Sequence, residues 1–519
     1  MKKLILLLLV LQFADIQLSH GQTYAYVPDS TFNSDGLKTF TYFNNIDRLY
    51  GCALQADDKL VTAGLSKNTA SSSFVLAVSR FLTNGDPDTS FGTANGTIYI
   101  PLGQLGSIGG QTPKVQIAPD GKIVAAASSM GNGTSNDMFV CRLDSTGTLD
   151  PTFHSSGTLS FDMTGLANLP DMVNALDIDS NGTIWLAGVT RNGSSPLNND
   201  FAVAKVKSDG TLDISFDTDG KKLFNITGIA EFARSIKIDQ NGKLVIAGVS
   251  GTNLLVFRID STGVLDPSFN TTGYNSFTFG SGSDLADMDI DSNNAIVVVG
   301  QVGSSSSSFA VARLTSAGIL DNTFGTGGKF TATITGYSCT ATSIHIQNDN
   351  RIIAGGYADI TGQGSNFIAA RVTDAGALDL TFNGTGYVQT PIITGAVDEL
   401  GNGMAVMNDG RILMTGTIVY SSAVNEDCGM LRWKPVLQTT GMDEANAEVS
   451  LRALPNPFMN ELQVYSQKEG ILTISDVNGR NILQQSICAG QTLINTTEFP
   501  SGMYFVQVNG QRALQLIRQ

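Results

Sequence analysis

Short apolar runs alternate with turns that contain Gly, Asp or Asn along most of this chain. The clearest copy of one recurring stretch is residues 254–269, LLVFRIDSTGVLDPSF, where an apolar run carries Arg258 and a turn at Gly263 precedes Leu-Asp-Pro-Ser-Phe. Short apolar runs separated by Gly-bearing turns predict antiparallel strands joined by hairpins. Near-copies of the stretch end at Phe91, Phe153, Phe216, Phe324 and Phe382.

The repeat is marked by an Asp-x-x-Phe motif. Successive motifs lie 53 to 63 residues apart, and a period near this length is typical of a propeller or a solenoid. Between two motifs the pattern predicts four short strands, which is the content of one propeller blade. The motif aspartates are Asp29, Asp88, Asp150, Asp213, Asp266, Asp321 and Asp379.

The two ends of the repeat array complement each other. The motif at Asp29 precedes every third and fourth strand, whereas the last fourth strand, which ends at Trp433, has no motif after it. If the array closes into a ring, the N-terminal element completes the last blade and no sheet edge stays open. We therefore predict an all-β, seven-bladed β-propeller over residues 22–434 rather than an open array.

A basic residue stands eight positions before the Asp of six motifs. This spacing predicts one ion pair in each repeat, and the seventh basic residue, Arg432, is expected to pair with Asp29 across the ring closure. The motif Asp can cap a helical turn and the Phe can fill the space between blades, so we interpret the motif as a structural corner. The seven basic residues are Arg80, Arg142, Lys205, Arg258, Arg313, Arg371 and Arg432.

The combination of LD-x-[ST]-F-x-x-x-G with D-x-x-G-[KR]-[IL]-hh-AG over residues 29–433 resembles the delta-60 repeat family of bacterial secreted proteins. This resemblance implies a β-propeller and no established activity.

After a polar stretch at 435–447, which we interpret as a linker, residues 448–519 alternate apolar and polar positions around Asn-Gly and Ser-Gly turns. The alternation predicts a small Ig-like β-sandwich. The module resembles the type A C-terminal sorting domain of the type IX secretion system of Bacteroidetes. The resemblance is carried by PNPF at 455–458, the stretch 474–480, PSGMY at 500–504 and Arg518, although Arg518 stands alone where such tails often end in several lysines. It implies passage through the periplasm and the outer membrane by the type IX machinery, then release or anchoring at the cell surface.

Residues 1–21 form a predicted signal peptide. Lys2 and Lys3 precede an apolar segment at 4–14 that is too short to span a bilayer, and Ser19 and Gly21 fit a cleavage site before Gln22. No later segment is long and apolar enough to be a transmembrane helix. The resemblance to the type IX sorting domain implies a Gram-negative protein that is secreted or held at the outer cell surface.

The net charge of −15 disfavours nucleic acid and anionic membranes as partners, because both need clustered Lys and Arg. The five cysteines are widely spaced and odd in number, which indicates neither a zinc site nor a disulfide framework. We expect four of the cysteines to act as small apolar side chains. As a separate expectation, the protein is a monomer. The cysteines are Cys52, Cys141, Cys339, Cys428 and Cys488.

Candidate chemical residues are few, and we assign no catalytic, cofactor-binding or metal-binding residue. His154 and His345 have no nucleophile motif nearby. The segments that begin at Asp177 and Asp289 resemble half of a calcium loop, but Gly188 and Gly300 stand where a bidentate Glu is required, so hairpin turns are the better interpretation. A sialidase-like box at 179–185, which ends in Trp185, has the wrong spacing and is not repeated.

The preferred functional hypothesis is an exported propeller scaffold that binds an unknown extracellular ligand, either a glycan or a protein. The alternative is an extracellular hydrolase or lyase with a site at the propeller funnel, and a third possibility is a passive spacer. Charged residues that are periodic look structural, which disfavours catalysis. Convergent, non-periodic charges at one mouth of the channel would favour the enzyme.

Overall fold

The computed structural model describes residues 23–438 and 451–518 apart from short gaps. The gaps are 44–45, 68–72, 94, 104–111, 131–134, 167–168, 192, 194–198, 304–305, 335, 361–363, 394–397, 421–425, 455–457, 467–468, 478 and 509–513. The predicted signal peptide at 1–21 lies outside the described residues. The chain divides into unit 1, Met1–Thr439, and unit 2, Thr440–Gln519. No helix in the described part of the chain has the length and hydrophobicity needed to cross a bilayer.

Within its described residues, unit 1 contains six four-stranded sheets and one five-stranded sheet, and paired strands run antiparallel throughout. The first two sheets are β3 (Asp47–Leu54), β4 (Leu60–Lys67), β5 (Phe74–Phe81) and β6 (Thr97–Gly103), then β7 (Lys114–Ile117), β8 (Ile123–Met130), β9 (Asn136–Leu143) and β10 (Thr158–Phe161). The next two are β11 (Asp171–Ile178), β12 (Ile184–Arg191), β13 (Asn199–Val206) and β14 (Lys221–Phe224), then β15 (Glu231–Ile238), β16 (Leu244–Ser250), β17 (Asn253–Ile259) and β18 (Tyr274–Phe277). The fifth and sixth are β19 (Asp284–Ile290), β20 (Ile296–Val302), β21 (Ser308–Leu314) and β22 (Lys329–Ala332), then β23 (Tyr337–Ile346), β24 (Ile352–Ile360), β25 (Gly364–Val372) and β26 (Tyr387–Thr390). The five-stranded sheet holds β27 (Asp398–Val406), β28 (Ile412–Val419), β29 (Glu426–Gln438), β1 (Thr23–Pro28) and β2 (Leu37–Phe40).

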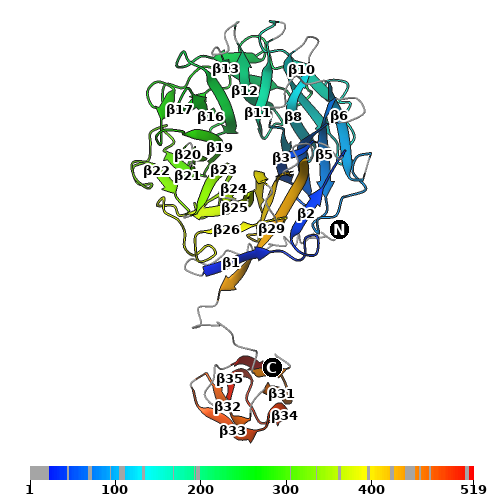
Figure 1. Cartoon of the computed structure of the whole chain (residues 1–519), viewed down its shortest axis with the longest axis vertical. Coiled ribbons are helices and arrows are strands. Elements are labelled where there is room, and N and C mark those ends of the chain that lie inside the picture. Colours follow the sequence, from blue (N-terminus) through cyan, green and yellow to red (C-terminus); the bar gives the residue numbers. More distant parts are fainter. Residues whose placement is uncertain are drawn as a thin grey trace, which may run out of the picture. The chain divides into compact units, whose positions relative to one another are not determined.

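The sheets of unit 1 follow one another around a ring (Figure 1). The first strand of each sheet contacts the first strand of the next, in the order β3, β7, β11, β15, β19, β23 and β27, and β27 contacts β3 again. These seven strands are called the inner strands below. Because the last sheet contacts the first, the array is closed, and the inner strands surround a common axis.

The closure joins the two ends of unit 1 in one sheet. On the edge of β29 that faces away from β28, β2 pairs with residues 428–431 and β1 with residues 433–438. Between these two pairings, Arg432 Nη2 lies 2.8 Å from Asp29 Oδ2, and both side chains are only 2% exposed. The predicted pairing of Arg432 with Asp29 is therefore confirmed. Residues 435–438, which the sequence analysis assigns to the linker, instead continue β29, because β1 offers them a partner strand.

The same ion pair recurs in the other sheets, as the spacing predicts. Arg258 shows its geometry: Nε donates to Asp266 Oδ2 at 2.8 Å, Nη1 donates to the carbonyl of Ser316 in the next sheet, and the guanidinium lies 4.9 Å from the ring centre of Phe269. Asp266 Oδ1 accepts the backbone N–H of Ser268 and so caps the turn. The other pairs are Arg80–Asp88, Arg142–Asp150, Lys205–Asp213, Arg313–Asp321 and Arg371–Asp379.

The core lies between neighbouring sheets. In β16, Val245, Ala247 and Val249 pack toward β19 and β20, whereas Leu244 and Ile246 pack toward β12 and β13. Successive side chains of a strand point to opposite faces, so a strand with a sheet on each side must be apolar at every position. The motif phenylalanines are also buried, at 0–1% exposure: Phe32, Phe91, Phe153, Phe216, Phe269, Phe324 and Phe382.

Cysteine adds no covalent link among the described residues. All five cysteines are free, three of them (Cys141, Cys339 and Cys428) are buried, and Cys52 is half-buried. Cys488 is exposed on unit 2. Burial raises the pKa of the Cys141 thiol to about 12, so this thiol stays protonated at neutral pH and acts as a small apolar side chain.

The described residues of unit 2 form two antiparallel sheets. One holds β30 (Leu451–Leu454), β31 (Glu461–Ser466) and β34 (Gly490–Asn495), and the other holds β32 (Gly470–Asp476), β33 (Asn481–Ile487), β35 (Gly502–Val508) and β36 (Leu514–Arg518). A single apolar cluster is shared by strands of both sheets and contains Phe458, Phe499 and Tyr504. Arg518 donates to the backbone carbonyls of Met459, Thr497 and Phe499 and thereby ties the last strand to two loops.

Candidate functional site at the ring axis

The inner strands share a local irregularity. In six of them the pairing to the second strand of the sheet shifts by one residue, which leaves one residue without a partner across the sheet. Such β-bulges bend a strand and redirect a side chain, and they are frequent next to binding sites. The residues at the shift are Tyr50, Asn174, Arg234, Ala286, Thr342 and Asn402.

All six bulge residues line one pocket, which we call the axial pocket. It has a volume of 220 Å³, and Lys114 of β7 also lines it, so every inner strand contributes a residue. A closed ring brings all seven strands to its axis, and the bulges present these side chains there. Concave sites lined by a few convergent polar groups are the usual place for ligands.

Three bulge side chains are used to join neighbouring sheets. Asn174 Nδ2 donates to the carbonyl of Ala233 at 3.0 Å, Thr342 Oγ1 donates to that of Gly401 at 2.6 Å, and Asn402 Nδ2 donates to that of Leu49 at 2.8 Å. In each case the acceptor directly precedes the bulge of the next inner strand. These bonds hold the rim of the axial pocket rigid.

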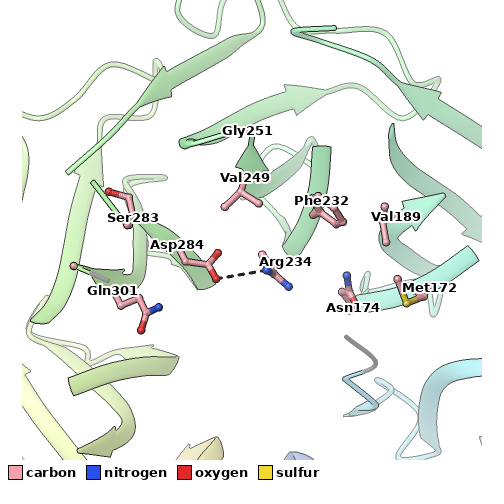
Figure 2. A pocket seen from close by; sticks show the side chains of 12 residues that line it. Met172, Asn174, Val189, Phe232, Arg234, Val249, Gly251, Ser283, Asp284 and Gln301 are labelled. Atoms are coloured by element: carbon pink, nitrogen blue, oxygen red, sulfur yellow. Dashed lines mark ion pairs between the residues drawn. The ribbon is translucent and has the colours of Figure 1, made fainter. Parts of the chain in front are cut away.

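Arg234 departs from this pattern. Its Nη2 lies 3.5 Å from Asp284 Oδ2, and its buried Nε has no hydrogen-bond partner among the described residues. Figure 2 shows the two side chains facing each other across the floor of a wider pocket. The pair is partly exposed, at 32% for Arg234 and 45% for Asp284, so it is accessible to a ligand.

The wider pocket, called the mouth below, has a volume of 660 Å³ and shares Asn174, Arg234 and Asp284 with the axial pocket. One side of it is apolar and is formed by Met172, Val189, Phe232 and Val249. The other side carries Ser283 and Gln301, as Figure 2 shows. The two pockets therefore form one funnel with a polar floor and one apolar wall.

A second group of charges lies further along the inner strands. Lys237 of β15 faces Asp177, Asp287 and Asp289 of the neighbouring strands, and these charges raise the pKa of Lys237 although burial alone would lower it. Burial lowers the pKa of His345 against the opposing effect of Asp289, and the nearby charge of Lys237 lowers it further. His345 is therefore held in its neutral form near pH 7.

The calcium-like segments form turns, as predicted. Asp179 Oδ1 accepts the N–H groups of Asn181 and Thr183, while the carboxylate of Asp177 binds Gln116 and the backbone of Ile238. The two carboxylates of the segment therefore serve separate partners. The segment at 289–293 behaves alike, since Asp291 caps its own turn and Asp289 accepts the N–H of Ile346.

The other residues considered from the sequence lie apart. His154 is an exposed turn residue with a positive φ of 45°. Trp185 is buried in the core against Phe216, with ring centres 5.2 Å apart. Of the two histidines, only His345 lies on an inner strand, β23. Sequence reasoning missed Lys114, Asn174, Arg234 and Asp284. For Lys114, Arg234 and Asp284 the available signal was that these charged residues do not recur at their position in the repeat, whereas Asn174 does recur, as Asn402.

One acidic cluster could hold a cation by geometry. The carboxylates of Asp137, Asp162 and Asp171 lie within 4.8 Å of one another. Burial raises the pKa of Asp171 to about 6, and the nearby Asp162 and Asp137 add to this effect. Asp171 also accepts the N–H of Met163 at 2.7 Å and the hydroxyl of Thr190, so it serves to anchor the loop before β11.

Comparisons with known families match both parts of the chain. The family described as "Domain of unknown function (DUF5122) beta-propeller" matches residues 55–91, 118–153, 240–269, 292–324 and 347–382. The family described as "Secretion system C-terminal sorting domain" matches residues 452–518. No curated protein is significantly similar in sequence to this chain.

Several solved structures resemble the chain in fold. Virginiamycin B lyase from Staphylococcus aureus, solved with quinupristin, is 12% identical with a TM-score of 0.42, over 76% of this chain and 98% of the lyase. PorZ, a surface component of the type IX secretion system of Porphyromonas gingivalis, is 13% identical with a TM-score of 0.32, over 93% of this chain and 75% of PorZ. The β-propeller domain of the Trilobed protease from Pyrococcus furiosus is 11% identical with a TM-score of 0.38, over 79% of this chain and all of that domain.

Proposed function

Because this chain carries DUF5122 β-propeller repeats and a C-terminal sorting domain of the type IX secretion system, we propose that it is an exported propeller that binds an extracellular ligand at its ring axis. The sorting domain indicates secretion by the type IX route to the cell surface or the exterior. The ligand is a glycan or a protein. A signal peptide at residues 1–21 would deliver the chain to the periplasm first.

The architecture we propose is a seven-bladed propeller followed by an Ig-like sandwich. The number of blades is supported by the seven inner strands, each in its own sheet, which contact one another in a closed circle. The sandwich is supported by the two sheets of unit 2 and their shared apolar cluster.

The main support for the proposed binding role is the axial pocket. All seven inner strands line it, and it opens into the 660 Å³ mouth. A structural spacer would need no such funnel, whereas a binding protein needs a rigid concave surface with convergent polar groups.

The binding role can be tested with the full mature chain on a glycan array and against a panel of extracellular proteins. Ala286→Trp should fill the axial pocket and abolish binding, while Ala286→Ser, the matched control, should leave both binding and melting temperature unchanged. The proposal is wrong if no glycan or protein binds, or if the Trp variant binds as the native chain does.

An extracellular hydrolase or lyase is the second candidate, and one observation favours it. Lys237, Asp289 and His345 come from three inner strands, and the charge of Asp289 acts to raise the pKa of both Lys237 and His345 against the effect of burial. Such clusters can serve acid–base chemistry. Product formation from a bound glycan that His345→Gln and Lys237→Met both abolish would support the enzyme. Unchanged turnover in both variants would exclude this site.

A further inference from the structure

We propose that the funnel recognises an acidic saccharide, with Arg234 and Lys114 binding the carboxylate of one sugar unit. This inference deepens the ligand-binding role proposed above and rests on it. Its basis is that two cations of the funnel have unused hydrogen-bond donors, in a chain whose net charge is −15.

Arg234 differs from the structural arginines of this fold. Arg258 uses Nε and both Nη atoms for hydrogen bonds inside the protein, whereas the described residues provide no hydrogen bond to Arg234 Nε and only the 3.5 Å ion pair with Asp284. A guanidinium presents its donors in a planar fork that matches a carboxylate. A carboxylate entering from the mouth could therefore bind the Nη atoms of Arg234 in competition with Asp284.

Lys114 supplies the second cation. Its side chain lines the axial pocket together with Arg234, and it makes no ion pair with any described residue. Burial lowers its pKa, Asp287 opposes this effect, and the like charges of Lys237 and Arg234 support it. Asp287 is occupied by Ser235 and by backbone N–H groups. A bound anion would relieve this repulsion between cations.

The uncharged groups of the funnel fit the hydroxyl groups of a sugar. Asn174 is 3% exposed, and its Oδ1 has no hydrogen-bond donor among the described residues, so it can accept from a hydroxyl. Gln301 Oε1 accepts from Thr340 at 2.6 Å, which leaves its NH₂ group to donate toward the mouth. Hydroxyl groups both donate and accept, and the wall formed by Met172, Val189, Phe232 and Val249 can cover the apolar face of a sugar ring.

The inference can be tested by calorimetry, which measures the binding of an oligogalacturonate and of its methyl ester to the full mature chain. The two probes share every sugar unit and differ only at the carboxyl groups, which are charged in the acid and carry a neutral methyl ester in the second probe. Arg234→Gln and Lys114→Gln should each weaken oligogalacturonate binding roughly 10-fold or more, as expected for loss of a charge-assisted hydrogen bond. Lys207→Gln, which removes an exposed cation outside the funnel, is the matched control and should change affinity less than about 2-fold.

Asp284 gives a test of opposite sign. Asp284→Asn keeps the shape of the side chain but removes the charge that competes for Arg234, so oligogalacturonate should bind more tightly. A merely structural role for Arg234 would not produce opposite effects in Arg234→Gln and Asp284→Asn.

Each outcome decides between the proposals. If the methyl ester binds as tightly as the acid, or if Arg234→Gln has no effect, the acidic-saccharide inference is wrong while the binding role stands. If an acidic peptide such as oligoglutamate binds and saccharides do not, the proposed ligand class is wrong, although Arg234 and Lys114 still bind the anion. If Ala286→Trp leaves all binding unchanged, the axial site itself is excluded.

Discussion

At the scale of single residues, each repeat depends on an Arg or Lys, an Asp and a Phe that act together. In the copy at Arg258, the aspartate caps its own turn, pairs with the cation and holds it against the phenylalanine ring, and the cation reaches the next sheet. The pair is almost fully buried, at 7% exposure for each side chain. A buried ion pair contributes little more to stability than an apolar replacement would. Removing one partner, however, leaves an unpaired charge in the protein interior.

Asp266→Ala should therefore be strongly destabilising. It leaves the buried Arg258 without its main partner, and such a loss costs about 3–5 kcal/mol. Asp260→Ala, the control, removes a carboxylate that caps a surface turn of the same sheet and should cost about 1 kcal/mol. Urea denaturation of both variants measures the difference. Equal losses would show that the ion pair is not shielded as the structure has it.

The motif carboxylates also predict acid sensitivity. Burial alone would raise the pKa of Asp88, but hydrogen bonds from Ser90 and the charges of Arg80 and Lys59 lower it to about 2, and similar interactions bring Asp213 to about 2. The pKa of an unfolded Asp is about 3.9. Because the folded values are depressed, these groups stabilise the fold above about pH 4, and that stability is lost as the pH falls from about 4 to 2.

Melting temperatures recorded between pH 6 and pH 2 check this expectation, because the range runs from above the unfolded pKa down to the folded pKa. The melting temperature should fall most steeply below about pH 4. A variant with Asp213→Asn should lose less stability over this interval than the native chain, although it starts lower. A native chain that melts at the same temperature across the acid range would contradict the assignment.

At the scale of strands and sheets, two features organise the molecule. Bulges turn the inner strands toward the axis, and the N-terminal strands β1 and β2 complete the sheet of β27, β28 and β29. The closing sheet is strengthened beyond pairing alone. Tyr26 packs on Phe382 with ring centres 4.2 Å apart, and Asn383 accepts from the backbone of Tyr26, so β1 also binds the neighbouring sheet.

Deleting residues 23–40 should open the ring. The deletion removes β1 and β2 and takes away Asp29, so β29 becomes a bare edge and Arg432 loses its partner. Bare sheet edges invite aggregation. We expect a large drop in melting temperature and concentration-dependent aggregation, measured by calorimetry and light scattering.

The matched control for this deletion removes residues 440–519, which form a separate unit. Unit 1 should then melt close to its temperature in the full chain. If both deletions had the same small effect, the ring would not depend on its closure.

At the scale of the whole molecule, the two units carry different features. Unit 1 carries the funnel, and unit 2 carries the sorting domain at residues 452–518. Each unit has its own apolar core. The sorting domain and the proposed binding site therefore lie on separate units.

Removal of residues 448–519 should abolish export without unfolding unit 1. In a bacterium with a type IX system, the full chain should be found at the surface or in the medium and the truncated chain in the periplasm, as measured by cell fractionation and immunoblotting. An unrelated periplasmic protein fused to residues 448–519 is the control and should be exported. Truncated chain outside the cell would contradict the role of unit 2.

The strands, the order of the repeats and the pairing of the chain ends could all be predicted from the sequence. These features depend on local periodicity and on pairs of residues at a fixed spacing. The pair of Arg258 and Asp266, for example, has a counterpart at the same spacing in other repeats. The candidate site could not be predicted in this way, because Lys114, Asn174, Arg234 and Asp284 are far apart in the chain and come together only in the folded ring. A one-residue shift in strand pairing brings Asn174 and Arg234 to the axis, and such a shift depends on neighbouring strands rather than on the local pattern of apolar residues.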